Sequence, residues 1–380
     1  MKTRKMAAIF SNQHEYKALS PLTDERSLST LYFAGKYRLM DFPLSSIVDA
    51  GINDIYTLIN QEKVRSYLDH LGGGKEWGLS TIGSYEYLDF YQNIMRKQSS
   101  GANYFDDLIT FLETSNYPYA VLIENKMIGN FDLQSILHFH QENNDKITAV
   151  FKRVSEDNVA NDDQMFILDE NNTIISNQQT IDAQHQDFYN LSMNIFVTDT
   201  DWLIAELKKA QKSGISLDLG QKLTALAAKY RTHAYEYTGY LHNVHDIKSY
   251  YDANMEMLDK KKRDQLLYGN QKIITRIRNE VGTYFSKDSK VRNSMLATGC
   301  RINGEVINSV LSRRVSVSEN AKLINSVVMA NVVLEKGCTV ENAIIDKNVV
   351  IKKNVTIKGT SEKPLVIKKG AIITKDIIKK

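Results

Sequence analysis

The sequence predicts an α/β domain with a mostly parallel, Rossmann-like sheet, followed by a left-handed parallel β-helix of hexapeptide repeats. Short apolar runs alternate with amphipathic segments up to about residue 255, and a six-residue period replaces this alternation near the end of the chain. The length of 380 residues and the apolar fraction of 42% provide enough material for two hydrophobic cores.

The first domain is expected to span residues 1–255. Strands that alternate with helices indicate a mostly parallel sheet covered on both faces. Ligands of such sheets lie beyond the carboxyl ends of the strands, so the loops after Phe10 and Ile123 are the first candidates for a site. The expected strands are residues 6–10, 54–59, 119–123, 147–152, 165–168 and 193–198, and the expected helices are residues 62–71, 104–113, 133–142, 202–212, 221–230 and 247–258.

Residues 256–291 form the next segment, which carries the basic run of residues 260–263. A run of like charges is usually solvated surface. We therefore interpret this segment as a linker followed by a first strand that leads into the β-helix.

The β-helix is expected to span residues 292–380. From Ile324 the sequence divides into units of six residues, a period typical of a parallel β-helix in which three short strands make one coil. An antiparallel sheet would instead give a period of two and a turn every eight to twelve residues. The fourth position of each unit forms a mostly aliphatic column, which holds Val327, Val333, Thr339, Ile345, Ile351 and Ile357.

The composition excludes several classes of function. A formal charge of +3 gives no reason to expect nucleic acid or an anionic membrane as a partner. Cys300 and Cys338 form no CxxC motif and have no neighbouring histidine, so we expect no metal site on them and a reduced, cytoplasmic protein. The apolar run of residues 6–10 is too short for a signal peptide, and no run approaches the ~20 residues of a membrane span.

Three groups of motifs stand out along the chain. The N-terminal block consists of Pro-Leu-Thr at residues 21–23, Gly-Lys-Tyr-Arg at 35–38, Asp-Phe-Pro-Leu-Ser at 41–45 and Gly-Ile at 51–52. Ser-Met-Asn-Ile at residues 192–195 and Tyr-Tyr-Asp-Ala-Asn at residues 250–254 follow. These motifs resemble the bacterial glucose-1-phosphate adenylyltransferase (ADP-glucose pyrophosphorylase) family, which combines a nucleotidyltransferase domain with a hexapeptide β-helix. The resemblance extends over essentially the whole chain.

The resemblance implies a reaction that joins ATP and glucose 1-phosphate, and the phosphate-binding loop for this reaction is altered. The family has a glycine-rich Gly-Gly-x-Gly-Thr-Arg-Leu loop, in which glycine lets the backbone approach the phosphates. The corresponding residues 13–19 contain no glycine, and Ala18 takes the position of the arginine. Glu15 adds a negative charge, whereas Lys17 could still contact an anion.

Both carboxylates that hold Mg²⁺ in the family correspond to amides in this chain. Asn125 and Asn243 occupy the two aspartate positions. A neutral amide oxygen is a much poorer ligand for Mg²⁺ than a carboxylate. Glu124 and Asp246 lie close in sequence, but Glu124 is on the opposite face of its strand and Asp246 is three residues out of register. We expect this chain to bind no cofactor and the Mg²⁺ to reside in a catalytic partner.

The sugar-phosphate site also departs from the family pattern. The Glu-Lys-Pro motif that supplies the family's lysine is absent, and Asn194 replaces a glycine. No Lys or Arg occurs between Arg153 and Lys208, whereas this interval carries eleven acidic residues. A sugar phosphate would be repelled there unless cations arrive from elsewhere in the fold.

Together these losses predict a chain that is inactive or very weak alone and resembles the family's non-catalytic, D-type regulatory subunit. The resemblance implies a heterotetramer with a catalytic subunit, and an effector that acts on it. Lys36, Arg38 and Lys17 are the candidate effector or anion contacts. Arg38 could equally form a surface salt bridge with Asp41, and the family's activator lysine corresponds to Leu28.

Two other functions remain open at this stage. An active nucleotidyltransferase could use Glu124, Asp246 and Lys17 as rewired ligands. A hexapeptide acyltransferase would need a general base, usually histidine, on a coil of the β-helix. All eight histidines lie at or before His245, which argues against this second alternative.

Overall fold

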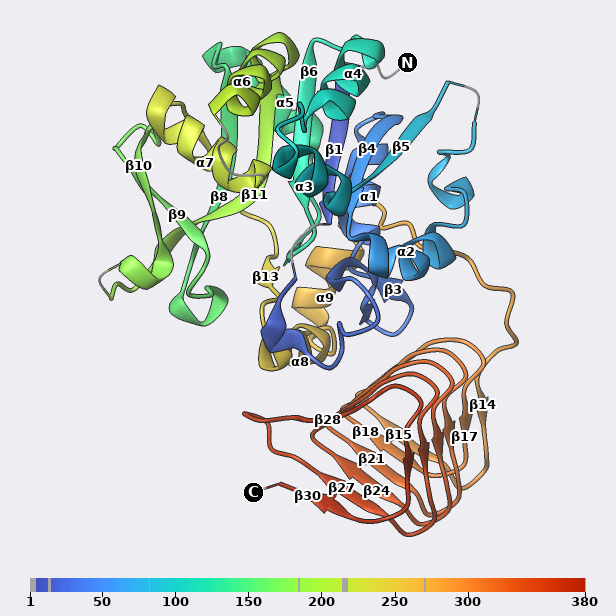
Figure 1. Ribbon diagram of the computed structural model, residues 1–380. Coiled ribbons are helices and arrows are strands. Elements are labelled where there is room, and N and C mark those ends of the chain that lie inside the picture. Colours follow the sequence, from blue (N-terminus) through green and yellow to red (C-terminus); the bar gives the residue numbers. More distant parts are fainter. Residues whose placement is uncertain are drawn as a thin grey trace. The chain divides into compact units, whose positions relative to one another are not determined.

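The computed structural model describes residues 5–12, 15–81, 83–183, 185–213, 218–269 and 271–379 (Figure 1). The chain forms two compact units, each assembled from segments that are not contiguous in sequence. The described residues of Met1–His14, Phe42–Asn243 and Asn270–Ile274 form the first unit, and those of Glu15–Asp41, Val244–Gly269 and Thr275–Lys380 form the second.

A mixed sheet forms the centre of the first unit and has nine strands among the described residues. Its order is β10-β9-β11-β6-β1-β4-β5, and β8 pairs with both β11 and β12. β6, β1, β4 and β5 are parallel neighbours, whereas β11 runs antiparallel to β6, β8 and β9. The strands are β1 (Met6–Asn12), β4 (Asp54–Ile59), β5 (Tyr85–Phe90), β6 (Tyr119–Glu124), β8 (Ile147–Val154), β9 (Gln164–Leu168), β10 (Ile174–Gln179), β11 (Tyr189–Asp199) and β12 (Ala234–Glu236).

Helices pack on this sheet and supply much of its hydrophobic core. Phe111, Leu207 and Leu223 come from three different helices and join Leu122 and Phe196 of the sheet in one buried cluster. The helices are α1 (Asp41–Asp49), α2 (Val64–Leu71), α3 (Tyr91–Ser99), α4 (Asp106–Ser115), α5 (Leu133–Asn143), α6 (Thr200–Ser213) and α7 (Leu219–Tyr230). The alternation of strands and helices expected from the sequence is confirmed, although α1, α3, β5, β10 and β12 were not predicted.

The second unit contains the β-helix, whose parallel strands form three sheets (Figure 1). The first sheet comprises β14 (Tyr284–Phe285), β17 (Arg301–Ile302), β20 (Ser316–Val317), β23 (Val333–Leu334), β26 (Val350–Ile351) and β29 (Ile372–Ile373). The second comprises β15 (Lys290–Arg292), β18 (Glu305–Ile307), β21 (Lys322–Ile324), β24 (Thr339–Glu341), β27 (Thr356–Lys358) and β30 (Ile377–Ile378). The third comprises β16 (Met295–Leu296), β19 (Val310–Leu311), β22 (Val327–Val328), β25 (Ala343–Ile345) and β28 (Leu365–Ile367).

The interior column of the β-helix coincides with the fourth position of the six-residue unit only in the later units. Ile345, Ile351 and Ile357 lie in the buried core, but in the first three units the core residues are Val328, Leu334 and Val340, one position later. Val333 is 36% exposed. Paired residues of the middle coils lie 17 residues apart, as Val317 and Leu334 do, rather than the 18 of three six-residue units. The predicted fold is thus confirmed, although the strict period of six does not hold in every coil.

Asparagine forms most of the corners of the β-helix. These residues adopt the left-handed backbone conformation, which asparagine tolerates better than other residues with a Cβ atom. Their amides also stack between coils, as in the 3.0 Å bond that Asn331 donates to Asn348. The corner asparagines with positive φ are Asn293, Asn308, Asn320, Asn325, Asn331, Asn342, Asn348 and Asn354.

Two further helices and a short hairpin belong to the second unit. The helices are α8 (Ile247–Glu256) and α9 (Lys260–Leu267), and the hairpin pairs β2 (Tyr32–Phe33) with β3 (Tyr37–Arg38). The segment interpreted as a linker thus contains the helix α9. Asp259 caps this helix by accepting the Lys262 backbone N–H at 2.9 Å. Within the ranges described above, no helix combines the length and apolar character needed to cross a membrane.

Candidate functional site

The carboxyl ends of β1 and β6 bring two asparagines together. These strands are parallel neighbours, with Ser11 opposite Glu124, so their last residues emerge at the same edge of the sheet. There the Asn125 side-chain amide donates a hydrogen bond to the Asn12 side-chain oxygen. Asn12 and Asn125 are each 6% exposed. The first of the two expected metal positions is therefore occupied by a buried amide pair.

Glu124 lies beside Asn125 but makes a separate contact. Its carboxylate accepts a 2.9 Å hydrogen bond from the Asn194 amide. Asn194 lies in β11 with φ +50°, where the register of the β11–β8 pairing shifts. Asparagine tolerates this left-handed conformation, as glycine does, better than most other residues. A carboxylate bonded to an amide thus lies beside the position expected for the sugar.

Gly220, in the first turn of α7, approaches the same carboxylate. A Cβ atom at this position would lie 3.0 Å from Glu124 Oε1. Asp218 caps the helix by accepting the Gln221 backbone N–H at 3.0 Å. A larger residue here would press on the Glu124 side chain, so the small size of glycine suits the close packing.

The second expected metal position, Asn243, lies in a small sheet formed by β7 (Met127–Ile128) and β13 (His242–Asn243). Its amide donates to the Asp163 carboxylate at 2.6 Å and to the Asn158 carbonyl oxygen at 3.0 Å. Lys126, which precedes β7, forms an ion pair with the other oxygen of Asp163. This Lys126–Asp163–Asn243 network was not predicted, although Lys126 directly follows Asn125 in the sequence.

These residues do not fit a bound Mg²⁺ ion. Both amides donate through nitrogen to oxygen acceptors, and the buried Asp163 carboxylate beside Asn243 is already paired with the Lys126 ammonium group. A magnesium site requires oxygen ligands in an octahedral arrangement, usually with one or two carboxylates. In the part of the chain that the structure describes, no group of three or more His, Cys, Asp or Glu side chains could hold a metal.

The altered phosphate loop lies only partly within the described residues. Gln13 and His14 fall outside them. Lys17 and Ala18 lie on a short 3₁₀ helix, η1 (Lys17–Leu19), and are exposed, whereas Leu19 is buried. A single exposed lysine is the remaining cationic feature of this part of the loop.

Two of the other candidate anion contacts lie in the β2–β3 hairpin. The Arg38 guanidinium stacks on the Tyr32 ring at 3.5 Å and donates to the Thr30 carbonyl oxygen. Burial lowers the pKa of Arg38. Its backbone N–H, rather than its side chain, makes the 2.8 Å bond to Asp41. Lys36 is exposed, with its ammonium group 4.9 Å from the Tyr37 ring.

Leu28 and Asp246, also singled out from the sequence, have structural roles. Leu28, at the activator-lysine position, is buried in the second unit. Asp246 is the N-cap of α8 and forms a capping box with Ser249, whose backbone N–H it accepts at 2.7 Å. Asp246, one of the residues considered as a rewired ligand, therefore serves as a helix cap.

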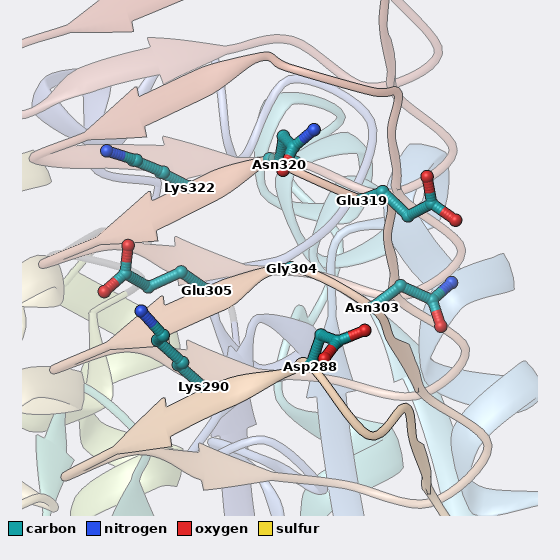
Figure 2. Close-up of a pocket in the computed structure, with 9 residues that line it drawn as sticks. Asp288, Lys290, Asn303, Gly304, Glu305, Glu319, Asn320 and Lys322 are labelled. Carbon is teal, nitrogen blue, oxygen red and sulfur yellow. The ribbon is translucent and has the colours of Figure 1, made fainter.

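A groove of about 470 Å³ lies on the β-helix (Figure 2). Figure 2 shows Lys290, Glu305 and Lys322 in one column on successive coils. Opposite charges that face each other across neighbouring strands attract, and with two lysines and one glutamate the column keeps a net positive charge. The groove contains none of the predicted site residues and no histidine. It therefore does not provide the general base of an acyltransferase.

Comparison with known proteins places these features in context. The family described as "Nucleotidyl transferase" matches residues 17–260, and the family described as "GlmU-like, C-terminal hexapeptide" matches residues 281–364. The chain is 31% identical to "Glycogen biosynthesis protein GlgD" of Bacillus subtilis (strain 168), covering 93% of both chains. It is 32% identical to the protein of the same name from Geobacillus stearothermophilus, covering 97% of both. It is 30% identical to "Glucose-1-phosphate adenylyltransferase" of Clostridioides difficile (strain 630), covering 84% of this chain and 83% of that protein.

Proposed function

Because this chain belongs to the glucose-1-phosphate adenylyltransferase-like family of nucleotidyl transferases, we propose that it acts in glycogen biosynthesis as a catalytically degenerate, regulatory subunit. Its partner is a catalytic subunit that makes ADP-glucose from ATP and glucose 1-phosphate and that holds the Mg²⁺. The two chains form a hetero-oligomer, with a heterotetramer as the expected assembly.

The observation that carries this proposal is the state of the two metal positions. Asn125 donates to Asn12, and Asn243 donates to Asp163, so both side chains act as hydrogen-bond donors. Metal ions and positioned cations stabilise the charge that develops on transferring phosphoryl groups, and removing one such interaction typically costs about 3–4 kcal/mol of transition-state stabilisation. With the glycine loop also absent, a very large loss of rate is expected.

The alternative, an active enzyme with rewired ligands, has less support. Glu124 bonds to Asn194, and Asp246 caps α8. Each carboxylate therefore has a role in the fold that a metal ion would disrupt. Lys17 is exposed, but one lysine does not replace a loop of backbone N–H groups around the phosphates.

An assay of the purified chain tests the loss of activity. The chain would be incubated with Mg²⁺, ATP and glucose 1-phosphate, and pyrophosphate release would be measured beside a catalytic adenylyltransferase as the positive control. We expect no turnover above background. A rate on the order of 10 s⁻¹, typical of enzymes, would overturn the proposed degeneracy.

Exposed apolar side chains at the first coil of the β-helix support association with a partner. Phe285 pairs with the buried Ile302 of the next coil, yet is 49% exposed itself. Ile277 and Val281, which precede the first coil, are 73% and 80% exposed. Neighbouring exposed apolar residues of this kind are typical of protein–protein contact sites.

A regulatory role predicts a functional effect as well as binding. An effector or subunit shifts its neighbour only when its contacts differ between that neighbour's conformations. Titrating this chain into the catalytic subunit should therefore change the rate or the effector response, and gel filtration should show a mixed species. Absence of a mixed species at micromolar concentrations would contradict the proposal.

A further inference from the structure

We propose that the Lys126 ammonium group is a tethered cation that takes the place of the divalent metal ion in this domain. The same geometry predicts that removing the ammonium group should allow a divalent cation to bind at Asp163. The inference rests on the proposed loss of metal-dependent catalysis, but its test measures metal binding and stability rather than turnover.

The Lys126 ammonium group belongs to a buried network in which both oxygens of the Asp163 carboxylate accept hydrogen bonds. The side chains of Lys126 and Asp163 are each 5% exposed. Besides its contact with Asp163, the Lys126 Nζ lies 3.6 Å from the Asp162 carboxylate. The second oxygen of Asp163 accepts from the Asn243 amide at 2.6 Å and from the Ala160 backbone N–H at 2.7 Å. The cation and the second metal-position residue therefore share one carboxylate.

The charge distribution of the sequence explains why the cation comes from Lys126. Asp163 lies in the interval between Arg153 and Lys208 that contains no Lys or Arg. A buried carboxylate without a partner is strongly destabilising. Lys126 is 37 residues away in sequence, two residues after strand β6, and supplies the required positive charge. The positive charge that pairs with Asp163 thus comes from outside the acidic interval.

The same ammonium group excludes a metal ion. A divalent cation at Asp163 would lie within a few ångströms of a buried positive charge, where repulsion is strong because little water screens it. Without the ammonium group, the surrounding groups are oxygen donors that Mg²⁺ and Mn²⁺ prefer. They are the carboxylates of Asp162 and Asp163 and the Asn158 carbonyl oxygen, which accepts from the same Asn243 amide that bonds to Asp163.

The experiment compares the full-length protein with Lys126→Ala and Lys126→Met, and uses Lys126→Arg as the matched control that keeps the charge. Mn²⁺ binding would be measured by electron paramagnetic resonance, and Tm would be measured in EDTA, Mg²⁺ and Mn²⁺. We expect the wild-type protein and Lys126→Arg to bind no Mn²⁺ and to show no metal-dependent shift in Tm. The Ala and Met variants should have a lower Tm in EDTA, recover in Mn²⁺, and bind roughly one Mn²⁺ per chain with oxygen ligation.

Adding Asp163→Asn to Lys126→Ala should abolish this binding, because it removes the carboxylate that holds the ion. The inference is overturned if neither Lys126 variant binds Mn²⁺, if both fail to fold even with Mn²⁺ present, or if the wild-type protein binds Mn²⁺ through Asp163. These outcomes leave the proposed function standing as long as the wild-type protein shows no Mg²⁺-dependent turnover. Mg²⁺-dependent turnover by the wild-type protein would also overturn the proposed function.

Discussion

A single atom in the side chain separates Asp from Asn at the two metal positions, but it reverses the direction of their hydrogen bonds. Asn243 donates to Asp163 through an N–H group that an aspartate would not have. An aspartate there would place two carboxylates in contact, with one ammonium group to share. The residues around Asn243 therefore match an amide rather than a carboxylate. The change from the family's aspartate thus involves the neighbours of Asn243 as well as Asn243 itself.

This arrangement predicts the outcome of a simple repair. The double substitution Asn125→Asp and Asn243→Asp should not restore pyrophosphate release, because the glycine loop and the sugar-phosphate lysine are also missing. Asn243→Asp alone should lower the free energy of unfolding by about 1–3 kcal/mol, since it replaces a buried donor with a charged acceptor. Urea denaturation and the pyrophosphate assay would measure the two effects. Turnover close to that of a catalytic subunit would show that the other losses matter less than proposed.

At the scale of elements, the segment of residues 15–41 is attached to the β-helix within the second unit. Arg26 forms a bidentate pair with Asp346, at 2.8 and 2.6 Å, and both side chains are almost completely buried. Tyr251 of α8 donates to the Asn325 carbonyl oxygen at 2.6 Å. These contacts group the hairpin segment and α8 with the β-helix, although they lie far apart in sequence.

The buried ion pair makes a specific prediction about stability. Arg26→Met should destabilise the protein by about 3–5 kcal/mol, because it leaves the Asp346 carboxylate buried without its partner. The double variant Arg26→Met with Asp346→Leu should recover most of this loss, since no unpaired charge remains. Urea denaturation of both variants would measure the difference. A double variant no more stable than Arg26→Met would contradict the unpaired charge as the cause.

Across the whole molecule, buried tyrosines link stability to alkaline pH. Burial raises the pKa of Tyr37, Tyr237 and Tyr251 to about 12, from an ordinary value of 10.0. The folded state therefore resists the loss of these protons while the unfolded chain releases them. The stability that these residues contribute is present below pH 10 and is lost as pH rises through about 12.

We therefore expect the free energy of unfolding to fall steeply above pH 10, and part of the tyrosinate absorbance to appear only on unfolding. Circular dichroism and absorbance at 295 nm, recorded on the same samples, would test this coupling. Tyr237→Phe serves as the control, because it removes one titrating group and should reduce the slope. Complete tyrosine ionisation while the circular dichroism remains native would contradict the prediction.

Much of the fold could be predicted because its signals are local. The alternation of apolar runs and amphipathic segments predicted most of the central sheet and its helices, and the six-residue period predicted the β-helix. The strict period of six does not hold between coils, whose paired residues lie 15, 17 or 22 residues apart. Leu334, rather than Val333, therefore faces the interior. The strand β5 and the helices α1 and α3 were not predicted.

The sequence by itself determined the fold class and the family, because both depend on residue types at fixed spacings, and it predicted the two altered metal positions. Only the tertiary structure decided what those positions contact. Lys126 meets Asp163 across 37 residues, Asn243 meets Asp163 across 80, and Arg26 meets Asp346 across 320. The packing of strands and coils brings such pairs together. A buried charge without a partner is strongly destabilising, but no local sequence pattern identifies which residue the partner will be.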